Sequence, residues 1–248
     1  ISQQANLRIS NITIKNFRTF YGEKKPIELS INTKNPVTVI HGVSGRGKTT
    51  LLNAIHWCIY GKENKKLDQK RSVSEGLIHN YVIDTLEREE NMFVRIIMEN
   101  ENGETQYEIE REIIIKKSGV GTDLDWNPTL LAKVPTSITA TQAVKFAYRD
   151  PDTDELIRIS APDVVEDRLK ILFPEILSSY ILFDAELLSA FEDQEAKSTL
   201  VQEGIETLTG LPLVTSAIEN IGKENRKTVK ENTSGKLRLT SLMQDVDK

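Results

Sequence analysis

Short apolar runs separated by turn residues open the chain, a pattern typical of strands. The run over residues 7–17 predicts a first strand, and residues 27–31 predict a strand that returns beside it. Residues 37–40 read Val-Thr-Val-Ile and are β-branched throughout. They predict a short strand that is buried on both faces.

A helical period follows this run. Apolar residues recur at i, i+3, i+4, i+7 and i+8, which predicts a helix with one buried stripe. The stripe consists of Leu51, Ala54, Ile55, Cys58 and Ile59. Gly61 follows, and glycine readily takes the left-handed conformation that closes a helix, so we expect the helix to end there.

Two hairpins are predicted in the middle of the chain. Asn102-Gly103 is a strong hairpin signal, and Pro151 between two aspartates marks a second turn. The flanking strand-like runs are residues 91–99 with 105–116 and residues 144–148 with 156–159. We therefore expect antiparallel pairing within each pair of runs.

The other segments predict a loop over residues 118–128 and a helix that Ser160 caps and that runs to about residue 173. Residues 180–183 predict one more short strand. Near the C-terminus, apolar residues return at helical spacing, either as the start of a coiled coil or as an ordinary surface helix. These residues are Leu239, Leu242, Met243 and Val246.

Residues 42–49 match the phosphate-loop pattern G-x-x-x-x-G-K-[ST] in full, between a predicted strand and a predicted helix. Glycines let successive backbone N–H groups face phosphate oxygens, and the helix N-terminus adds partial positive charge. Lys48 is expected to reach the β- and γ-phosphates, and the Thr49 hydroxyl to bind Mg²⁺. The residues expected at the nucleotide are Gly42, Ser44, Gly45, Arg46, Gly47, Lys48, Thr49 and Thr50. The pattern predicts an ATP and Mg²⁺ site.

Such a site also needs an acid that holds Mg²⁺ and activates water. The run at residues 180–183 ends in Asp184, and Glu186 follows after Ala185. Asp184 is therefore a candidate for the metal and Glu186 for polarising water, with Lys48 as the third catalytic candidate. The alternative is a buried strand that ends in a surface aspartate.

Composition limits the kinds of partner and site that the chain can have. The formal net charge is −5 and the pI about 5.4, so charge alone does not suggest a tight nucleic-acid binder. One cysteine excludes an internal disulfide and a cysteine metal cluster. No apolar stretch reaches the roughly 18–20 residues of a membrane span. We expect a cytoplasmic protein without membrane contact.

Three segments together resemble the N-terminal lobe of an ABC-type ATPase head of the SMC and RecF-like class. Residues 12–20 resemble the opening I-x-N-F-R-x-F of that class, and residues 49–61 resemble its T-T-L-L-x-A-I-x-x-x-L-Y-G. Residues 174–186 resemble a P-x-x-x-x-x-x-F-F-D-G-E stretch. That stretch is typical of DndD-like ATPases of DNA-sulfur-modification and anti-phage systems, including the SMC-like subunit of Lamassu systems.

The resemblance implies an α/β fold with a mixed sheet, antiparallel β hairpins and helices. It implies an ATPase lobe over residues 1–212 and a helical stalk over residues 213–248 that begins a coiled coil. Near the nucleotide it implies Arg18, Thr19 and Phe20. It places Asp184 in the Q-loop, near Mg²⁺ and the attacking water.

The resemblance covers half of a family head. The sequence contains no L-S-G-G-[QE] motif and no apolar run that ends in Asp-Glu. The resemblance implies that ATP is held between two copies of the protein in a head-to-head dimer. The resemblance further implies non-specific DNA binding through phosphates, a nuclease effector and an accessory subunit.

The function that this implies is an ATPase subunit that couples head engagement to DNA sensing in anti-phage defence. A DNA-repair or chromosome-maintenance clamp of the same class is the first alternative. A stand-alone P-loop kinase is the second, although no lid with clustered arginines is evident. An ABC transporter ATPase is disfavoured, because a chain of about this length would contain its signature motif.

Overall fold

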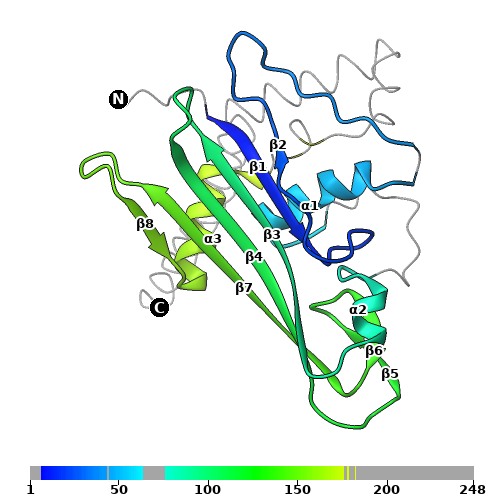
Figure 1. Cartoon of the computed structure of the whole chain (residues 1–248). Coiled ribbons are helices and arrows are strands. Elements are labelled where there is room, and N and C mark those ends of the chain that lie inside the picture. The colour runs from blue at the N-terminus through cyan, green and yellow to red at the C-terminus, as the bar shows by residue number, and fades with distance from the viewer. Residues whose placement is uncertain (1–6, 44, 64–75, 176–177, 179–181, 183–248) are drawn as a thin grey trace, which may run out of the picture. The chain divides into compact units, whose positions relative to one another are not determined.

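A six-stranded sheet with the strand order β2-β1-β3-β4-β7-β8 organises the structure, and all its pairings are antiparallel (Figure 1). The computed structural model describes residues 7–43, 45–63, 76–175, 178 and 182. The sheet strands are β1 (Arg8–Lys15), β2 (Ile27–Glu28), β3 (Glu89–Glu99), β4 (Thr105–Lys117), β7 (Ile138–Arg149) and β8 (Leu156–Ile159). A separate hairpin consists of β5 (Leu124–Asn127) and β6 (Ala132–Pro135).

Three helices are described, α1 (Lys48–Tyr60), α2 (Asn80–Asp84) and α3 (Pro162–Leu172). α1 packs on β3 and β4, α3 packs on β7, and the two helices contact each other (Figure 1). None of the helices in the described part of the chain has the length and apolar character needed to cross a membrane. The described residues fall in a unit that spans Ile1–Asp184, and the unit Ala185–Lys248 lies outside them.

Alternation along β3 and β4 divides the sheet into two faces. Every second side chain of these strands is buried, and the register places Ile96 opposite Ile109 and Met92 opposite Ile113. Successive side chains of a strand point to opposite sides, so one face is apolar and meets α1. We call this the inner face and the opposite one the outer face.

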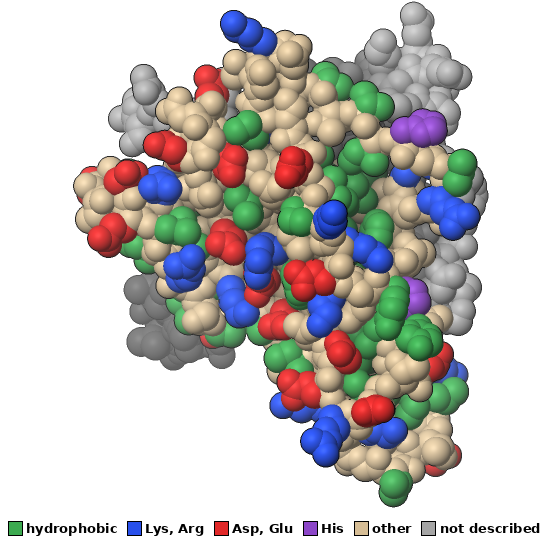
Figure 2. Space-filling view, in the orientation of Figure 1, with side chains coloured by type: hydrophobic (Ala, Val, Ile, Leu, Met, Phe, Trp, Pro, Cys, Tyr) green, Lys and Arg blue, Asp and Glu red, His purple; other side chains and the backbone are tan. Residues whose placement is uncertain are grey.

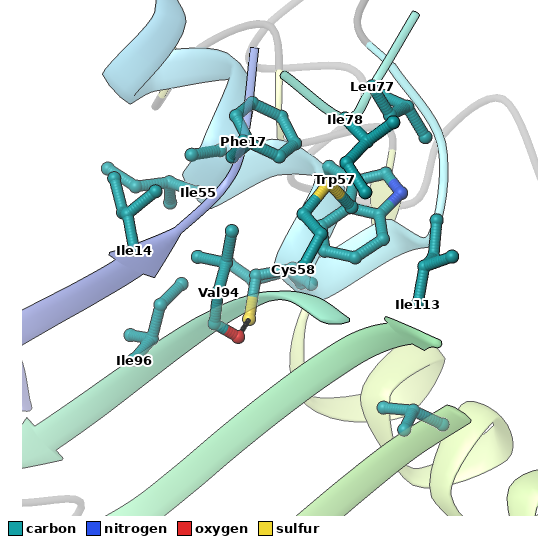
Figure 3. Packing of buried hydrophobic residues seen from close by; sticks show 14 of the residues in the cluster. Ile14, Phe17, Ile55, Trp57, Cys58, Leu77, Ile78, Val94, Ile96 and Ile113 are labelled. Carbon is teal, nitrogen blue, oxygen red and sulfur yellow. Dashed lines mark hydrogen bonds between the residues drawn. The ribbon is translucent and has the colours of Figure 1, made fainter. Parts of the chain in front are cut away.

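The core lies between the inner face and α1 (Figure 3). The indole of Trp57 is fully buried, and its ring centroid lies 5.6 Å from that of Phe17. The Cys58 Sγ donates a hydrogen bond to the Val94 carbonyl oxygen at 3.2 Å. Each fully buried large apolar side chain contributes about 1.5–3 kcal/mol. This packing fixes α1 on the sheet.

The structure confirms the predicted first strand, both hairpins and the helix after the phosphate loop. Gly61 ends α1 with φ 69°, and its amide donates to the Trp57 carbonyl oxygen at 2.8 Å. β7 is longer than predicted, and β2 retains two residues of the predicted run 27–31. The helical prediction at Pro162–Leu172 also holds, but Ser160 does not cap it: the N-cap is Ala161, which makes no side-chain bond.

The predicted buried strand at residues 37–40 is wrong. These residues form no strand, and the Val37 and Val39 side chains are 75% and 83% exposed. A strand buried on both faces needs neighbouring strands, and no described strand pairs with this run. For the same reason the expected mixed sheet is not observed, since the described sheet is wholly antiparallel.

The predicted loop at residues 118–128 is wrong in its second half, where β5 begins a hairpin with β6. The Asn127 side chain accepts hydrogen bonds from the Thr129 and Leu130 amides at 3.0 and 3.1 Å, which forms the turn. The predicted strand at residues 180–183 lies outside the described residues except for Leu182. The Leu182 amide donates to the Ser178 carbonyl oxygen, which is the spacing of a helical turn.

Candidate functional site

The phosphate loop enters α1 through two glycines with left-handed backbones. Gly45 has φ 76° and Gly47 has φ 93°, a region that disfavours side chains with a Cβ. Gly47 is the N-cap of α1 and offers no side-chain cap, and the first turn contains no acidic residue. The first N–H groups of a helix lack intrahelical partners, so this end of α1 is suited to bind an anion.

Lys48 lies across the loop. Its Nζ donates to the carbonyl oxygens of Gly42 at 2.7 Å and Val43 at 3.1 Å, and the Arg46 amide donates to the Val43 carbonyl at 3.4 Å. The Lys48 side chain is also exposed. The Lys48 ammonium group is therefore held against the backbone of the loop, at the N-terminal end of α1.

Thr19 and Phe20 lie beside the phosphate loop, next to Gly47. A Cβ built on Gly47 would lie 3.1 Å from the Phe20 ring and 3.2 Å from the Thr19 Oγ1. Glycine is therefore needed at position 47 for two reasons, its backbone angle and the lack of space. The structure thus places two of the three N-terminal residues implied by the resemblance in contact with the loop.

Arg18, the third of these residues, is held by an acid. Its backbone has φ 48°, its amide donates to the Leu77 carbonyl oxygen at 2.7 Å, and its guanidinium pairs with Glu63. The side chain is largely buried. Its contact with a nucleotide stays a prediction.

Three predicted site residues lie outside the described residues: Ser44, Asp184 and Glu186. Thr49 and Thr50 lie in the first turn of α1, where Thr49 is half-buried and Thr50 is buried. Within the described ranges, no group of three His, Cys, Asp or Glu side chains is arranged to hold a metal ion. The roles of Asp184 and Glu186 stay predictions.

At the other end of α1 lies a residue that the sequence analysis missed. Arg111 is on β4, its side chain is 1% exposed, and it bonds to the last turn of α1 and to Glu166 of α3. The signal was present, because Arg111 takes an inner-face position between Ile109 and Ile113. A single charged residue among the apolar, buried positions of a strand indicates that its charge has a buried partner.

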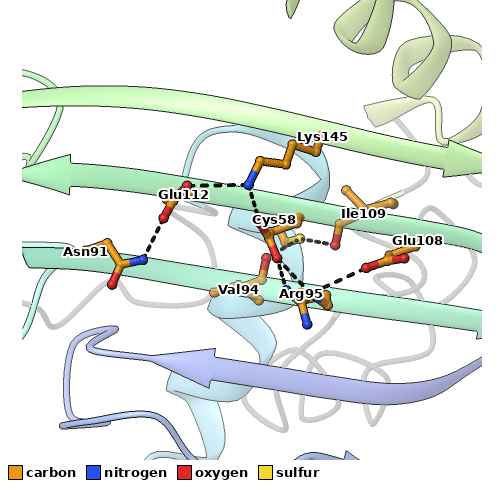
Figure 4. A network of polar contacts seen from close by, with 9 residues as sticks. Cys58, Asn91, Val94, Arg95, Glu108, Ile109, Glu112 and Lys145 are labelled. Atoms are coloured by element: carbon orange, nitrogen blue, oxygen red, sulfur yellow. Dashed lines mark hydrogen bonds and ion pairs between the residues drawn. The ribbon is translucent and has the colours of Figure 1, made fainter. Parts of the chain in front are cut away.

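The outer face of the sheet carries a charged network (Figure 4). Arg95, Glu110 and Lys145 are cross-strand neighbours on β3, β4 and β7. Glu110 accepts from the Arg95 Nε at 2.7 Å and from the Lys145 Nζ at 2.8 Å. Burial opposes ionisation of Glu110, but the hydrogen bonds from Lys145 and Arg95 outweigh it and lower the pKa of its carboxyl group.

Acidic and basic side chains are interspersed over this face (Figure 2). The cations Arg95 and Lys145 are matched by Glu108, Glu110 and Glu112. A surface that holds DNA through phosphates needs an excess of positive charge. The outer face is therefore not suited to that contact.

Comparisons with known proteins identify the family of the chain. A family model described as "AAA domain" matches residues 11–246, which is nearly the whole chain. The chain belongs to this AAA domain family. The match spans most of the sheet, α1 and α3 as well as the phosphate-loop motif.

Two curated relatives of this AAA domain are both described as "DNA replication and repair protein RecF". The protein from Natranaerobius thermophilus is 27% identical over 101 residues, which are 40% of this chain and 25% of the relative. The one from Chlorobium luteolum is 36% identical over 56 residues, 23% of this chain and 14% of the relative. The matched region is thus a quarter or less of each relative. The family and these similarities support the SMC and RecF-like class of ATPases.

Proposed function

We propose that this chain is the ATP-binding lobe of an SMC- and RecF-like ATPase that works on DNA. The phosphate loop carries the proposal, since the Lys48 ammonium group contacts the loop carbonyls of Gly42 and Val43 next to the uncapped N-terminus of α1. Both features suit the negative charge of a triphosphate. The family match is consistent with ATPase chemistry.

The residues present fit ATP with Mg²⁺. Lys48 would hold the β- and γ-phosphates, Thr49 would contribute its hydroxyl to Mg²⁺, and Thr50 would bind the α-phosphate. Bound Mg²⁺ would neutralise charge that develops on the transferred phosphoryl group. Asp184 is proposed to complete the metal shell, and Glu186 is proposed to polarise the attacking water.

We further propose that the catalytic site is shared between two lobes and between two copies of the protein. The exposed apolar side chains of residues 37–40 support a second lobe, because such a run directly before the loop would be buried by added strands. In this arrangement ATP binding closes two heads and hydrolysis reopens them. The second lobe would contribute the motifs that these 248 residues lack, L-S-G-G-[QE] and an apolar run that ends in Asp-Glu.

The biological role has two candidates. The RecF relatives favour DNA replication or repair. The sequence Phe183-Asp184-Ala185-Glu186 favours a DndD-like role in anti-phage defence, with a nuclease effector and an accessory subunit as partners. DNA would be bound non-specifically in either role.

The shared ATPase proposal is tested by measuring ATP hydrolysis of the full-length protein with and without DNA. We expect DNA to stimulate turnover. We expect Lys48→Ala to lower turnover about 100-fold or more, because the substitution removes the positive charge that Lys48 would place on the transferred phosphoryl group. The matched control is Lys34→Ala, an exposed lysine outside the loop. Equal turnover by the Lys48→Ala and Lys34→Ala variants would refute the proposal.

The two roles are separated by deleting the gene in its host. Loss of survival after DNA damage with unchanged plaque formation supports the repair role. Increased plaque formation with normal damage survival supports the defence role. Complementation with the Lys48→Ala variant should fail in whichever assay responds.

A further inference from the structure

Arg111 is a cation inside an apolar core. Its side chain lies on the inner face of β4, where the register places it between Val94 of β3 and Val144 of β7. Burying a guanidinium is unfavourable unless its donors are all engaged. What Arg111 contacts therefore shows why the charge is tolerated there.

Two hydrogen bonds of Arg111 go to the last turn of α1. The Arg111 Nε donates to the Cys58 carbonyl oxygen at 3.0 Å, and a terminal nitrogen donates to the Ile59 carbonyl oxygen at 3.3 Å. The last carbonyl groups of a helix lack intrahelical partners and carry its partial negative charge. α1 has no basic residue in its own last turn, so β4 supplies the cation.

The third bond reaches α3. The other terminal nitrogen of Arg111 donates to a Glu166 carboxylate oxygen at 2.6 Å. Arg111 therefore joins three elements, the sheet, the C-terminus of α1 and α3. A second link between the same regions, Lys62 with Glu175 at 2.7 Å, is more than half exposed at both side chains and contributes little.

Gly61 leaves no free space around this group. A Cβ built on Gly61 would lie 2.8 Å from a terminal nitrogen of Arg111 and 3.1 Å from its central carbon. The guanidinium thus packs directly on the backbone that closes α1. The guanidinium therefore restrains the backbone at that end of the helix.

The phosphate loop is at the opposite end of the same helix. α1 has 13 residues, so its ends are about 20 Å apart at about 1.5 Å of rise per residue. A helix of this length moves as a rigid body when one end is displaced. Binding groups such as the Lys48 ammonium must be held to within about 0.5 Å of their productive positions.

We propose that Arg111 is a positioning residue for the phosphate loop: by fixing the C-terminus of α1 to β4 and to Glu166, it sets the position of Lys48 and of the first-turn amides. The inference rests on the proposed ATP-binding function. It adds to that function a residue at the far end of the helix, outside the phosphate-loop motif. It also assigns Glu166 the part of holding the guanidinium in place.

The test measures the Kd of the full-length protein for a fluorescent ATP analogue with Mg²⁺, with the melting temperature of each variant in parallel. Arg111→Lys keeps the charge but cannot make all three bonds, and we expect its Kd to rise about tenfold. Glu166→Gln keeps the shape and one acceptor, and we expect a rise of about threefold. Asp167→Asn changes an exposed acid on the same helix and should leave Kd unchanged.

A purely structural role is distinguished by Ile113→Val, which trims a fully buried side chain two residues along β4. This variant should lower the melting temperature and leave Kd unchanged, whereas Arg111→Lys should change both. If Arg111→Lys does not fold, Glu166→Gln decides the question. A Kd within twofold of wild type for the folded Arg111 and Glu166 variants overturns the positioning role. Loss of binding in the wild type itself would instead overturn the proposed function.

Discussion

The two faces of the sheet are built from the same strands and differ in what stabilises them. On the inner face, Ile96 and Ile109 are removed from water together with Trp57 of α1, and each such side chain contributes about 1.5–3 kcal/mol. On the outer face, Arg95, Glu110 and Lys145 form ion pairs that are partly solvated and contribute about 0–1 kcal/mol each. Stability is therefore concentrated on the face that carries the phosphate-loop helix.

The difference also concerns charge. The outer face neutralises its cations with neighbouring acids and is left without an excess for a polyanion. The inner face contains one buried cation, Arg111, and uses it on the helix that leads from the phosphate loop. The cations of the outer face therefore pair with neighbouring acids, whereas Arg111 on the inner face binds the end of α1 and Glu166.

The largest expected effect is on the inner face. Trp57→Ala removes a fully buried indole that packs on Phe17, and we expect a loss of about 3–5 kcal/mol in the free energy of unfolding. Urea denaturation measures it. Trp126→Ala is the matched control, since the Trp126 side chain is 44% exposed, and it should cost less than about 1 kcal/mol. Similar losses in both variants would contradict the packing described for α1.

Gly61→Ala should come next, with a cost of about 3 kcal/mol. The added methyl meets both a left-handed backbone and the Arg111 guanidinium. Gly22→Ala is the control, because Gly22 has φ 71° and no atom within 4 Å of the added Cβ. It should cost about 1 kcal/mol from backbone strain alone. Chemical denaturation of both variants isolates the contact with Arg111, and equal costs would argue against it.

On the outer face, Glu110→Gln should cost about 1 kcal/mol at neutral pH, an amount limited by solvent screening around Lys145. The folded state lowers the pKa of Glu110 below its ordinary value of 4.5. Its ionised form therefore adds stability above that pH, and this is lost as the pH falls through the lowered pKa. Unfolding at pH 7 and at pH 3 should show the difference between wild type and variant shrinking in acid. Asp167→Asn, on an exposed pair, should show neither effect.

The smallest effect is expected where an apolar side chain is exposed. Val39→Ser in this chain should change the free energy of unfolding by less than about 0.5 kcal/mol. Val94→Ser, at a fully buried valine of the inner face, should cost at least about 2 kcal/mol. In a longer protein that includes a second lobe, Val39→Ser should become costly. An unchanged small effect there would show that residues 37–40 are not covered.

Local patterns predicted most of the sheet and the loop. The Asn102-Gly103 turn and the end of α1 at Gly61 each depend on neighbours within one element, and each was confirmed. The helix itself was also confirmed, but its burial exceeds the predicted single stripe, since residues 53–59 are all buried. The glycines of the phosphate loop were also predicted from their backbone requirements, and the left-handed angles of Gly45 and Gly47 agree. These features need no knowledge of distant parts of the chain.

The failures concern partners that are far away in sequence. The run at residues 37–40 has the composition of a buried strand, but burial requires neighbours that the described residues do not provide. Arg111 was missed because its role depends on carbonyl groups 52 and 53 positions earlier and on Glu166, 55 positions later. The missed β5–β6 hairpin is a different kind of failure, because its turn is local and is formed by the Asn127 side chain with the Thr129 and Leu130 amides.

Cys58 has a practical consequence for following this protein in solution. It is the one cysteine of the 248 residues, and burial raises the pKa of its thiol to about 12. The thiolate is the nucleophile that attacks thiol reagents, so the buried and protonated Cys58 should remain unmodified in the folded chain. A cysteine introduced at a fully exposed site, such as Val120, would then accept a fluorophore alone. A single substitution, Val120→Cys, would therefore allow site-specific labelling without replacing Cys58 in α1.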